Sequence, residues 1–182
     1  MVRRDAAEIG DKVLVSGTIG DGWLGLAACD SDLGLATADV AVLVDRYRLP
    51  QPRVELTDAL RAYAHAGADV SDGLIADAGN IARASAARLE LDLDRLPLSG
   101  PARLWLARQP DPAAARMNLA SGGDDYEVIC TAPPERVESI VAAGKARGVA
   151  LTVIGRVCAG HGVGVWSGGA EQSVVRAGWR HG

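Results

Sequence analysis

The stretch from Ala68 to Ser85, ADVSDGLIADAGNIARAS, decides the fold class. It opens on a short run that ends at Val70, passes through three turn-forming residues, and then changes to a helical period. The side chains of one narrow helix face follow at i, i+4, i+7, i+8 and i+11: Leu74, Ala78, Ile81, Ala82 and Ser85. The stretch therefore predicts the end of a strand, a tight acidic turn and a helix with one buried face.

The region before this stretch predicts a strand, an undecided segment and a helix. Residues 12–16 form a β-branched run between two Gly-Asp pairs, which is typical of a strand flanked by turns. The apolar run at 40–44 is too short for its period to distinguish a strand from a helix. The two prolines within 50–52 indicate an extended loop, and Thr57 is expected to cap a helix that runs to about Ala66.

The region after this stretch continues the alternation. Leucines alternate with acidic residues over 89–93, which predicts a half-buried strand, and a proline-punctuated segment follows at 96–112. The later elements, in chain order, are a helix at 112–120, a strand at 127–131, a helix from Pro133 to Gly148, a strand at 151–154 and two short strands in the glycine-rich tail. This alternation predicts one α/β domain with a mixed sheet and helices packed on the sheet.

The composition excludes several classes of protein. The 182 residues are 48% hydrophobic and 23% charged, which is enough chain for one domain with its own core. The formal net charge of −4 argues against a nucleic-acid-binding surface. No apolar run approaches the ~18 residues of a membrane span, and residues 1–5 lack the apolar core of a secretion signal. We therefore expect a cytoplasmic domain with neither a nucleic-acid nor a membrane partner.

Cysteine and histidine spacings do not predict a metal centre. The three cysteines are far apart, with no C-x-x-C pair, and the three histidines show no H-x-x-x-H spacing. Cys130 lies in an apolar run and is expected to be a buried free thiol.

The acidic turn at 69–73, called here the first acidic turn, is a candidate site. Asp69, Ser71 and Asp72 lie where a strand ends and a helix begins, so their oxygens can face a common point. Mg²⁺ prefers one or two carboxylates, with phosphates and water as its other ligands. The backbone N–H groups of the helix start suit an anionic phosphate. The alternative is structural: Ser71 or Asp72 caps the helix, and Asp69 is a solvated loop residue.

A second acidic turn, at 121–126, contains Ser-Gly-Gly-Asp-Asp ahead of the predicted strand at 127–131. Taken alone, it is equally typical of a tight turn before a strand. Two glycine-containing acidic turns in one acidic chain make a phosphate site with several magnesium ions a reasonable hypothesis.

One further glycine pattern is misleading. Residues 20–25 fit G-x-G-x-x-G, and Asp45 follows at about the distance expected of a dinucleotide-binding unit. The first glycine of the pattern, however, comes five residues after Val15, whereas a nucleotide-binding turn follows its strand directly. No P-loop pattern, nucleophile elbow or catalytic triad is present.

Several segments, taken in chain order, resemble the motifs of the thiamine-monophosphate kinase family. They are Gly10-Asp11 with 15–21, Arg46-Tyr47 with 50–53, Asp69-Val70-Ser71-Asp72-Gly73-Leu74 with Asp77, Leu96-Pro97-Leu98, 121–127, 154–157 and Gly178-Trp179-Arg180-His181. The resemblance implies the α/β C-terminal domain shared with aminoimidazole ribonucleotide synthetase and selenophosphate synthetase.

The resemblance also implies a domain organisation. It covers essentially the whole chain but only the C-terminal half of the family, whose members carry an N-terminal domain with most magnesium ligands and the dimer interface. We therefore expect residues 1–182 to form a single C-terminal-type ATP- and substrate-binding domain without the family's N-terminal domain. A homodimer is expected only if that N-terminal domain is present.

The activity that the resemblance implies is ATP-dependent phosphorylation of thiamine monophosphate to thiamine diphosphate, by in-line transfer aided by several Mg²⁺ ions. It assigns Asp69 and Asp72 to magnesium, Arg4 and Ser71 to ATP, and Asp124 and Trp179 to thiamine monophosphate. Phosphoryl transfer depends mainly on positioning and charge neutralisation, so no residue is assigned as a catalytic nucleophile.

Two other functions fit the same motifs. A domain that keeps the fold but lacks the family's N-terminal half can be a non-catalytic ligand-binding or partner module. The segment Ser71-Asp72-Gly73-Leu74 belongs to the whole superfamily, so a synthetase with a different phosphorylated substrate also fits. The segments at 122–127 and 178–181 favour thiamine monophosphate.

Overall fold

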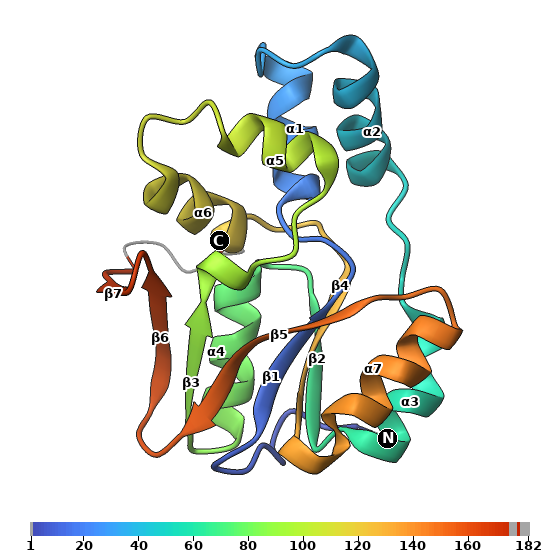
Figure 1. Cartoon of the computed structure of the whole chain (residues 1–182), viewed down its shortest axis with the longest axis vertical. Helices are drawn as coiled ribbons and strands as arrows, with labels where there is room; N and C mark the ends of the chain where they lie inside the picture. The colour runs from blue at the N-terminus through green and yellow to red at the C-terminus, as the bar shows by residue number, and fades with distance from the viewer. Residues whose placement is uncertain (1, 175–177, 179–182) are drawn as a thin grey trace.

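A computed structural model describes residues 2–174 and residue 178 of the chain. Within them, seven strands form one sheet in the order β2-β4-β1-β5-β3-β6-β7 (Figure 1). The strands are β1 (Lys12–Ser16), β2 (Ala66–Val70), β3 (Arg88–Asp92), β4 (Glu127–Ala132), β5 (Leu151–Cys158), β6 (Gly162–Ser167) and β7 (Ala170–Gln172). Strands β3 and β6 pair in parallel and the other neighbours are antiparallel. The predicted mixed sheet is confirmed.

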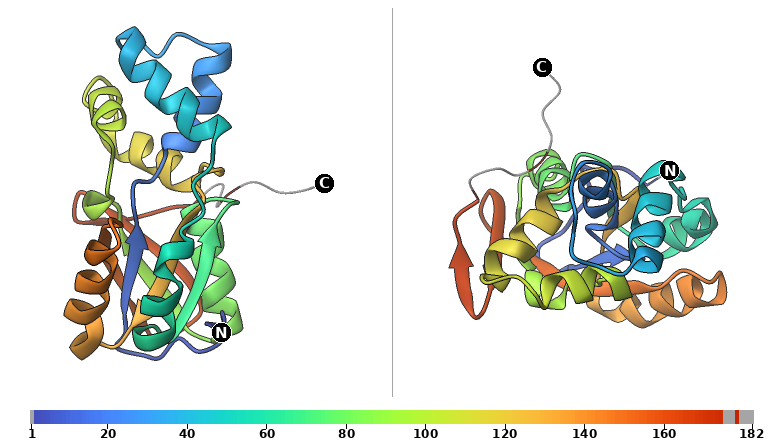
Figure 2. Two further views of the ribbon diagram at one scale, coloured as in Figure 1. Left: turned by 90° about the vertical axis from the view of Figure 1, so that its right-hand side faces the viewer. Right: turned by 90° about the horizontal axis from the view of Figure 1, so that it is seen from above.

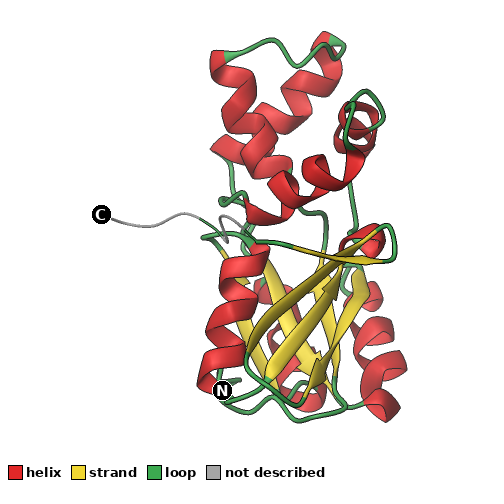
Figure 3. Cartoon of the chain, turned by 90° about the vertical axis from the view of Figure 1, so that its left-hand side faces the viewer, coloured by secondary structure: helices red, strands yellow, loops and turns green. Residues whose placement is uncertain are grey.

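Helices pack on both faces of the sheet, and four more of the described helices lie beyond one end of it. The described helices are α1 (Asp21–Asp30), α2 (Thr37–Arg48), α3 (Thr57–Tyr63), α4 (Leu74–Ala84), α5 (Gly100–Leu106), α6 (Pro112–Ser121) and α7 (Val137–Ala146), with 3-10 turns at Val54–Leu56, Leu93–Arg95 and Pro134–Arg136. Helix α4 lies on one face of the sheet, and α3 and α7 lie on the other (Figure 3). Helices α1, α2, α5 and α6 lie beyond one end of the sheet (Figure 2). None of the described helices is long and apolar enough to cross a membrane.

The central strand β1 serves both layers of the core, because side chains alternate between the two faces of a strand. Val13 and Val15 join the larger buried cluster, which includes Ile81 of α4. Leu14 joins the smaller cluster, which includes Ile140 of α7. Burial of these apolar side chains on both faces fixes the register of β1 at the middle of the sheet.

The strand, turn and helix predicted over 68–85 are confirmed. Strand β2 ends at Val70 and helix α4 begins at Leu74, with Ala78, Ile81 and Ala82 among its buried side chains. The predicted buried thiol is confirmed as well: Cys130 is fully buried, and burial raises its pKa to about 12.

The structure decides one open assignment and corrects one predicted boundary. The undecided run at 40–44 lies inside helix α2. The helix expected to run from Thr57 to about Ala66 ends at Tyr63, because Ala66 already pairs with Thr131 in the sheet. Thr57 is the first helical residue rather than the cap, and its hydroxyl donates to the carbonyl oxygen of Val54 at 2.7 Å.

Helices α1 and α5 were not predicted from the sequence. Helix α1 starts after Gly20, which offers no side-chain cap, and its first turns are rich in glycine. Helix α5 lies within the proline-punctuated segment, yet it carried a readable signal: Ser99 accepts a hydrogen bond from the Ala102 N–H, and Pro101 follows in the first turn.

Candidate functional site

The first acidic turn is organised by a buried carboxylate, Asp77, in the first turn of α4. Its Oδ2 accepts the backbone N–H groups of Ser71 at 3.0 Å and Asp72 at 3.1 Å, and its Oδ1 accepts the amide of Asn80 at 3.2 Å. Burial raises the pKa of Asp77, and these hydrogen bonds act in the opposite direction. The backbone of the turn is therefore held in place by the carboxylate of Asp77.

This arrangement corrects one expectation for the turn. Gly73, with φ 123°, is the N-cap of α4, so neither Ser71 nor Asp72 caps the helix. The N–H groups of Ser71 and Asp72 donate to Asp77, so these two donors are already satisfied within the chain. The turn offers a ligand carboxylate, hydroxyl and carbonyl oxygens. Oxygens of these kinds are the atoms that coordinate Mg²⁺ and other hard cations.

Arg4 and Asp69 lie together beside this turn. The side chain of Asp69 is 58% exposed, and its Oδ1 lies 3.4 Å from Nη2 of Arg4. Both residues line a shallow pocket of about 480 Å³, formed by the segment 2–5 against β2. Two residues that are far apart in sequence, one predicted for nucleotide and one for metal, are thus neighbours.

The second acidic turn packs directly against the first. The Asp124 N–H donates to the Ser71 carbonyl at 3.0 Å, and the Tyr126 N–H donates to the Val70 carbonyl at 2.9 Å. The approach is close enough to require glycine: a Cβ on Gly123 would lie 2.6 Å from the Ser71 carbonyl oxygen. The backbone itself therefore brings the two acidic turns together.

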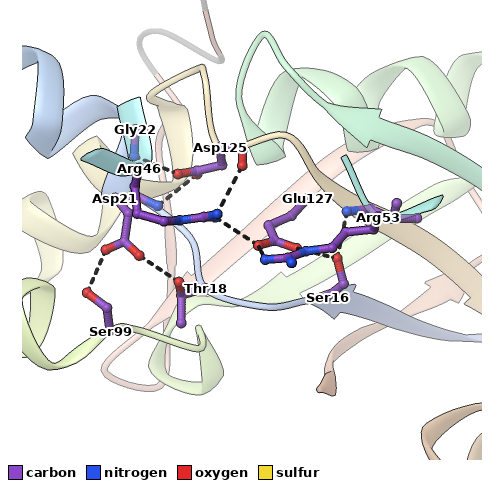
Figure 4. A network of polar contacts seen from close by, with 11 residues as sticks. Ser16, Thr18, Asp21, Gly22, Arg46, Arg53, Ser99, Asp125 and Glu127 are labelled. Atoms are coloured by element: carbon purple, nitrogen blue, oxygen red, sulfur yellow. Dashed lines mark hydrogen bonds and ion pairs between the residues drawn. The ribbon is translucent and has the colours of Figure 1, made fainter. Parts of the chain in front are cut away.

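The side chain of Asp125 is buried and points toward the start of α1 (Figure 4). Its Oδ2 accepts the Gly20 N–H at 2.7 Å and its Oδ1 accepts the Gly22 N–H at 2.9 Å. The neighbouring Asp21 accepts two hydroxyls, from Thr18 and Ser99, each at 2.6 Å. Two of the three glycines of the misleading G-x-G-x-x-G pattern thus bind a carboxylate of the same chain, and the antiparallel pairing of β1 with β4 and β5 excludes a dinucleotide-binding unit there.

The pKa of Asp125 predicts a pH-dependent stability. Burial raises this pKa to about 7, with Asp21 and Glu127 also raising it and the two glycine N–H groups lowering it. Between about pH 4 and pH 7 the folded chain then keeps a proton that the unfolded chain has released, so the contribution of Asp125 to stability falls as pH rises. A pKa difference of about 3 corresponds to about 4 kcal/mol.

Chemical unfolding of the wild type and Asp125→Asn from pH 4.5 to 8 checks this expectation. The variant stays neutral, so the stability advantage of the wild type is expected to shrink by several kcal/mol over that range. Asp30→Asn, at the exposed end of α1, is the control and should follow the wild type. A constant difference between wild type and Asp125→Asn would show that Asp125 is ionised throughout.

A buried ionic cluster joins the end of β1 to α2 and β4. We call Ser16, Arg46, Arg53 and Glu127 the Glu127 cluster (Figure 4). The fully buried Glu127 carboxylate accepts the Ser16 hydroxyl at 2.6 Å, Nη2 of Arg46 at 3.0 Å, and Nε and Nη2 of Arg53 at 2.7 and 2.5 Å. The hydrogen bond to Glu127 is the main cause that raises the pKa of Arg53. The sequence offered these residues only as parts of separate motifs.

The structure does not assemble every predicted site residue. Arg4, Asp69, Ser71, Asp72 and Asp124 lie on two adjoining turns and the segment beside them. Trp179, predicted for the substrate, lies outside the described residues. No group of three or more potential metal ligands gathers within the part of the chain that the structure describes. The oxygens of Asp69 and Asp72 suit Mg²⁺, which then needs its remaining ligands from phosphate, water or another part of the protein.

A groove of about 930 Å³ lies elsewhere. It runs over the sheet face beside α7 and is lined by residues such as Lys12, Glu90, Arg156 and Trp166. None of the predicted site residues that the structure describes lines it, and Glu90 is already paired with Arg156 at 2.8 Å.

Fold and turns together define an α/β domain that presents an oxygen-rich site at the ends of its strands. Residues 8–167 match the family described as AIR synthase related protein, C-terminal domain, and the chain belongs to this family. The fold expected from the sequence resemblance is thereby confirmed.

Several thiamine-monophosphate kinases are similar to this chain. That of Caulobacter vibrioides is 48% identical over 100% of the chain and 51% of its own length. The crystal structure from Stenotrophomonas maltophilia K279a is 41% identical, with a TM-score of 0.82 over 93% of this chain and 54% of that one. AaThiL, complexed with AMPPCP and TMP, is 32% identical with a TM-score of 0.78 over 99% and 54%. The chain thus spans about half the length of these relatives.

Proposed function

We propose that this chain supplies the C-terminal half of the active site of a thiamine-monophosphate kinase, which phosphorylates thiamine monophosphate to thiamine diphosphate with ATP. The observation that carries the proposal is the backbone contact between the two acidic turns, from the Asp124 N–H to the Ser71 carbonyl. It joins the residues predicted for magnesium and ATP to the residue predicted for the substrate. The AMPPCP and TMP bound to the related AaThiL support the same pair of ligands, since AMPPCP is an ATP analogue.

The chemistry that follows is positioning and charge neutralisation. Asp69 and Asp72 would hold Mg²⁺, which neutralises charge on the phosphates as the phosphoryl group transfers. Arg4 lies beside Asp69 and can turn its guanidinium to the nucleotide phosphates, while the Ser71 hydroxyl contacts ATP. Asp124, held at the junction of the turns, and Trp179 contact thiamine monophosphate. Each residue binds or orients a ligand, and none acts as a nucleophile.

The organisation of the whole protein belongs to the proposal. Residues 1–182 act as one C-terminal-type domain, and the family's N-terminal domain supplies the other magnesium ligands and, where present, the homodimer interface. The two carboxylates Asp69 and Asp72 are too few to hold several ions by themselves, which supports a divided site. The proposal includes a cytoplasmic location for this enzyme.

The test is an assay of the full-length protein that carries this chain. With thiamine monophosphate and Mg-ATP, we expect thiamine diphosphate and ADP in equal amounts, and neither when EDTA removes the metal. Thiamine without its phosphate is the control and should give no product. Binding of both ligands without product would indicate a non-catalytic module. ATP turnover with another phosphorylated substrate only would indicate a different synthetase of the superfamily.

A further inference from the structure

Arg46, at the end of α2, contacts the chain on both sides of Tyr126. Its Nη2 lies 3.0 Å from Oε1 of Glu127 and 3.4 Å from the backbone carbonyl oxygen of Asp125. The backbone between these contacts is unusual: Asp124 has φ 69° and Tyr126 has φ 52°. Left-handed conformations are unfavourable for residues with a side chain, so they persist only where surrounding contacts hold them.

Helices α1 and α2 thus hold both the side chain and the main-chain carbonyl of Asp125. The N–H groups of Gly20 and Gly22, at the start of α1, bind its carboxylate. Arg46, at the end of α2, binds its main-chain carbonyl. With the side chain of Asp125 fixed inward, the backbone of the preceding residue, Asp124, is held next to Ser71 by its N–H.

Arg53 offers a matched comparison within the same cluster. The side chains of Arg46 and Arg53 are 16% and 17% exposed, and both pair with the same carboxylate. Arg53 donates two hydrogen bonds to Glu127, at 2.7 and 2.5 Å, and among the described residues it makes none to the main chain of the turn. Arg53 therefore makes the stronger pair with Glu127, and Arg46 makes the link to the turn.

We propose that Arg46 is a positioning residue: it holds the second acidic turn in the conformation that presents Asp124 to the substrate. Arg53 by contrast stabilises the fold through Glu127 without acting on the turn. The assignment of Asp124 to the substrate rests on the proposed function, whereas the hold of Arg46 on the turn rests on the contacts of the guanidinium alone.

The test compares Arg46→Met with Arg53→Met in the full-length protein. Each variant leaves one arginine opposite Glu127, so the buried carboxylate keeps a counter-charge. Global unfolding should show the larger loss for Arg53→Met, which removes the two shorter hydrogen bonds. Amide hydrogen exchange at Asp124 and Tyr126 should show the reverse order, rising about tenfold in Arg46→Met relative to amides of the β1–β4 pair.

The outcomes separate a positioning role from a purely structural one. If exchange at the turn follows global stability in both variants, Arg46 is structural only and the proposal is wrong. Arg46→Lys keeps the positive charge and should restore part of the protection of the Asp124 and Tyr126 amides against exchange. It replaces Arg46→Met in the comparison if that variant does not fold. A local rise in exchange together with a raised KM for thiamine monophosphate, and an unchanged KM for ATP, supports both proposals. The same local rise with both KM values unchanged supports the hold on the turn and removes Asp124 from the substrate site.

Discussion

Replacing Asp69 or Asp72 with asparagine in the full-length protein is expected to lower kcat for thiamine diphosphate formation by about a hundredfold or more. Asparagine keeps the shape of the side chain but removes the negative charge that a magnesium ligand supplies, and loss of one electrostatic contact of this kind has effects of that size. The fold should be retained in Asp69→Asn, because its carboxylate is 58% exposed and its pair with Arg4 is solvent-screened.

The measurement is kcat against magnesium concentration, with thermal unfolding of each variant alongside. Asp5→Asn is the matched control, since Asp5 is exposed and lines the same shallow pocket but has no role in the proposed site. The two site variants should also show weaker Mg²⁺-dependent binding of AMPPCP in calorimetry. Normal turnover in both site variants would remove the metal assignment while leaving the family assignment in place.

Glu127→Gln is expected to be the most destabilising single polar substitution in the chain, at about 3–5 kcal/mol, because it leaves two largely buried guanidinium groups without their counter-charge. The amide of glutamine can accept from only one side, so part of the set of four donors from Ser16, Arg46 and Arg53 also loses its acceptor. Urea unfolding at neutral pH measures this loss.

Glu138→Gln on the exposed side of α7 is the control and should change stability by less than about 0.5 kcal/mol. A loss below about 1 kcal/mol for Glu127→Gln would mean that the cluster is not a principal contact between β1, α2 and β4. Adding Arg46→Met to Glu127→Gln should restore part of the stability, since it removes one of the two unpaired charges.

Local sequence patterns were sufficient for much of this fold. The strand, turn and helix over 68–85 could be predicted because a strand end, turn residues and a helical period follow one another within 18 residues. Strand β1, helix α6 and strand β4 were likewise predictable from short runs and their flanking glycines and prolines. Helix α1 was not, because Gly20 provides no side-chain cap and its conformation is fixed by Asp125, a residue about a hundred positions away.

The candidate site likewise has features that the sequence determined and features that only the tertiary structure decided. The sequence determined which oxygens are available, since Asp69, Ser71, Asp72 and Asp124 stand in recognisable turns. Only the tertiary structure decided that Asp77 takes the N–H groups of the first turn, and that Arg4 lies beside Asp69. It also brought Arg46 and Arg53 onto Glu127, across 81 and 74 positions of chain. The physical reason is that hydrogen bonds and ion pairs depend on distance in space, and sheet pairing together with helix packing sets which distant residues meet.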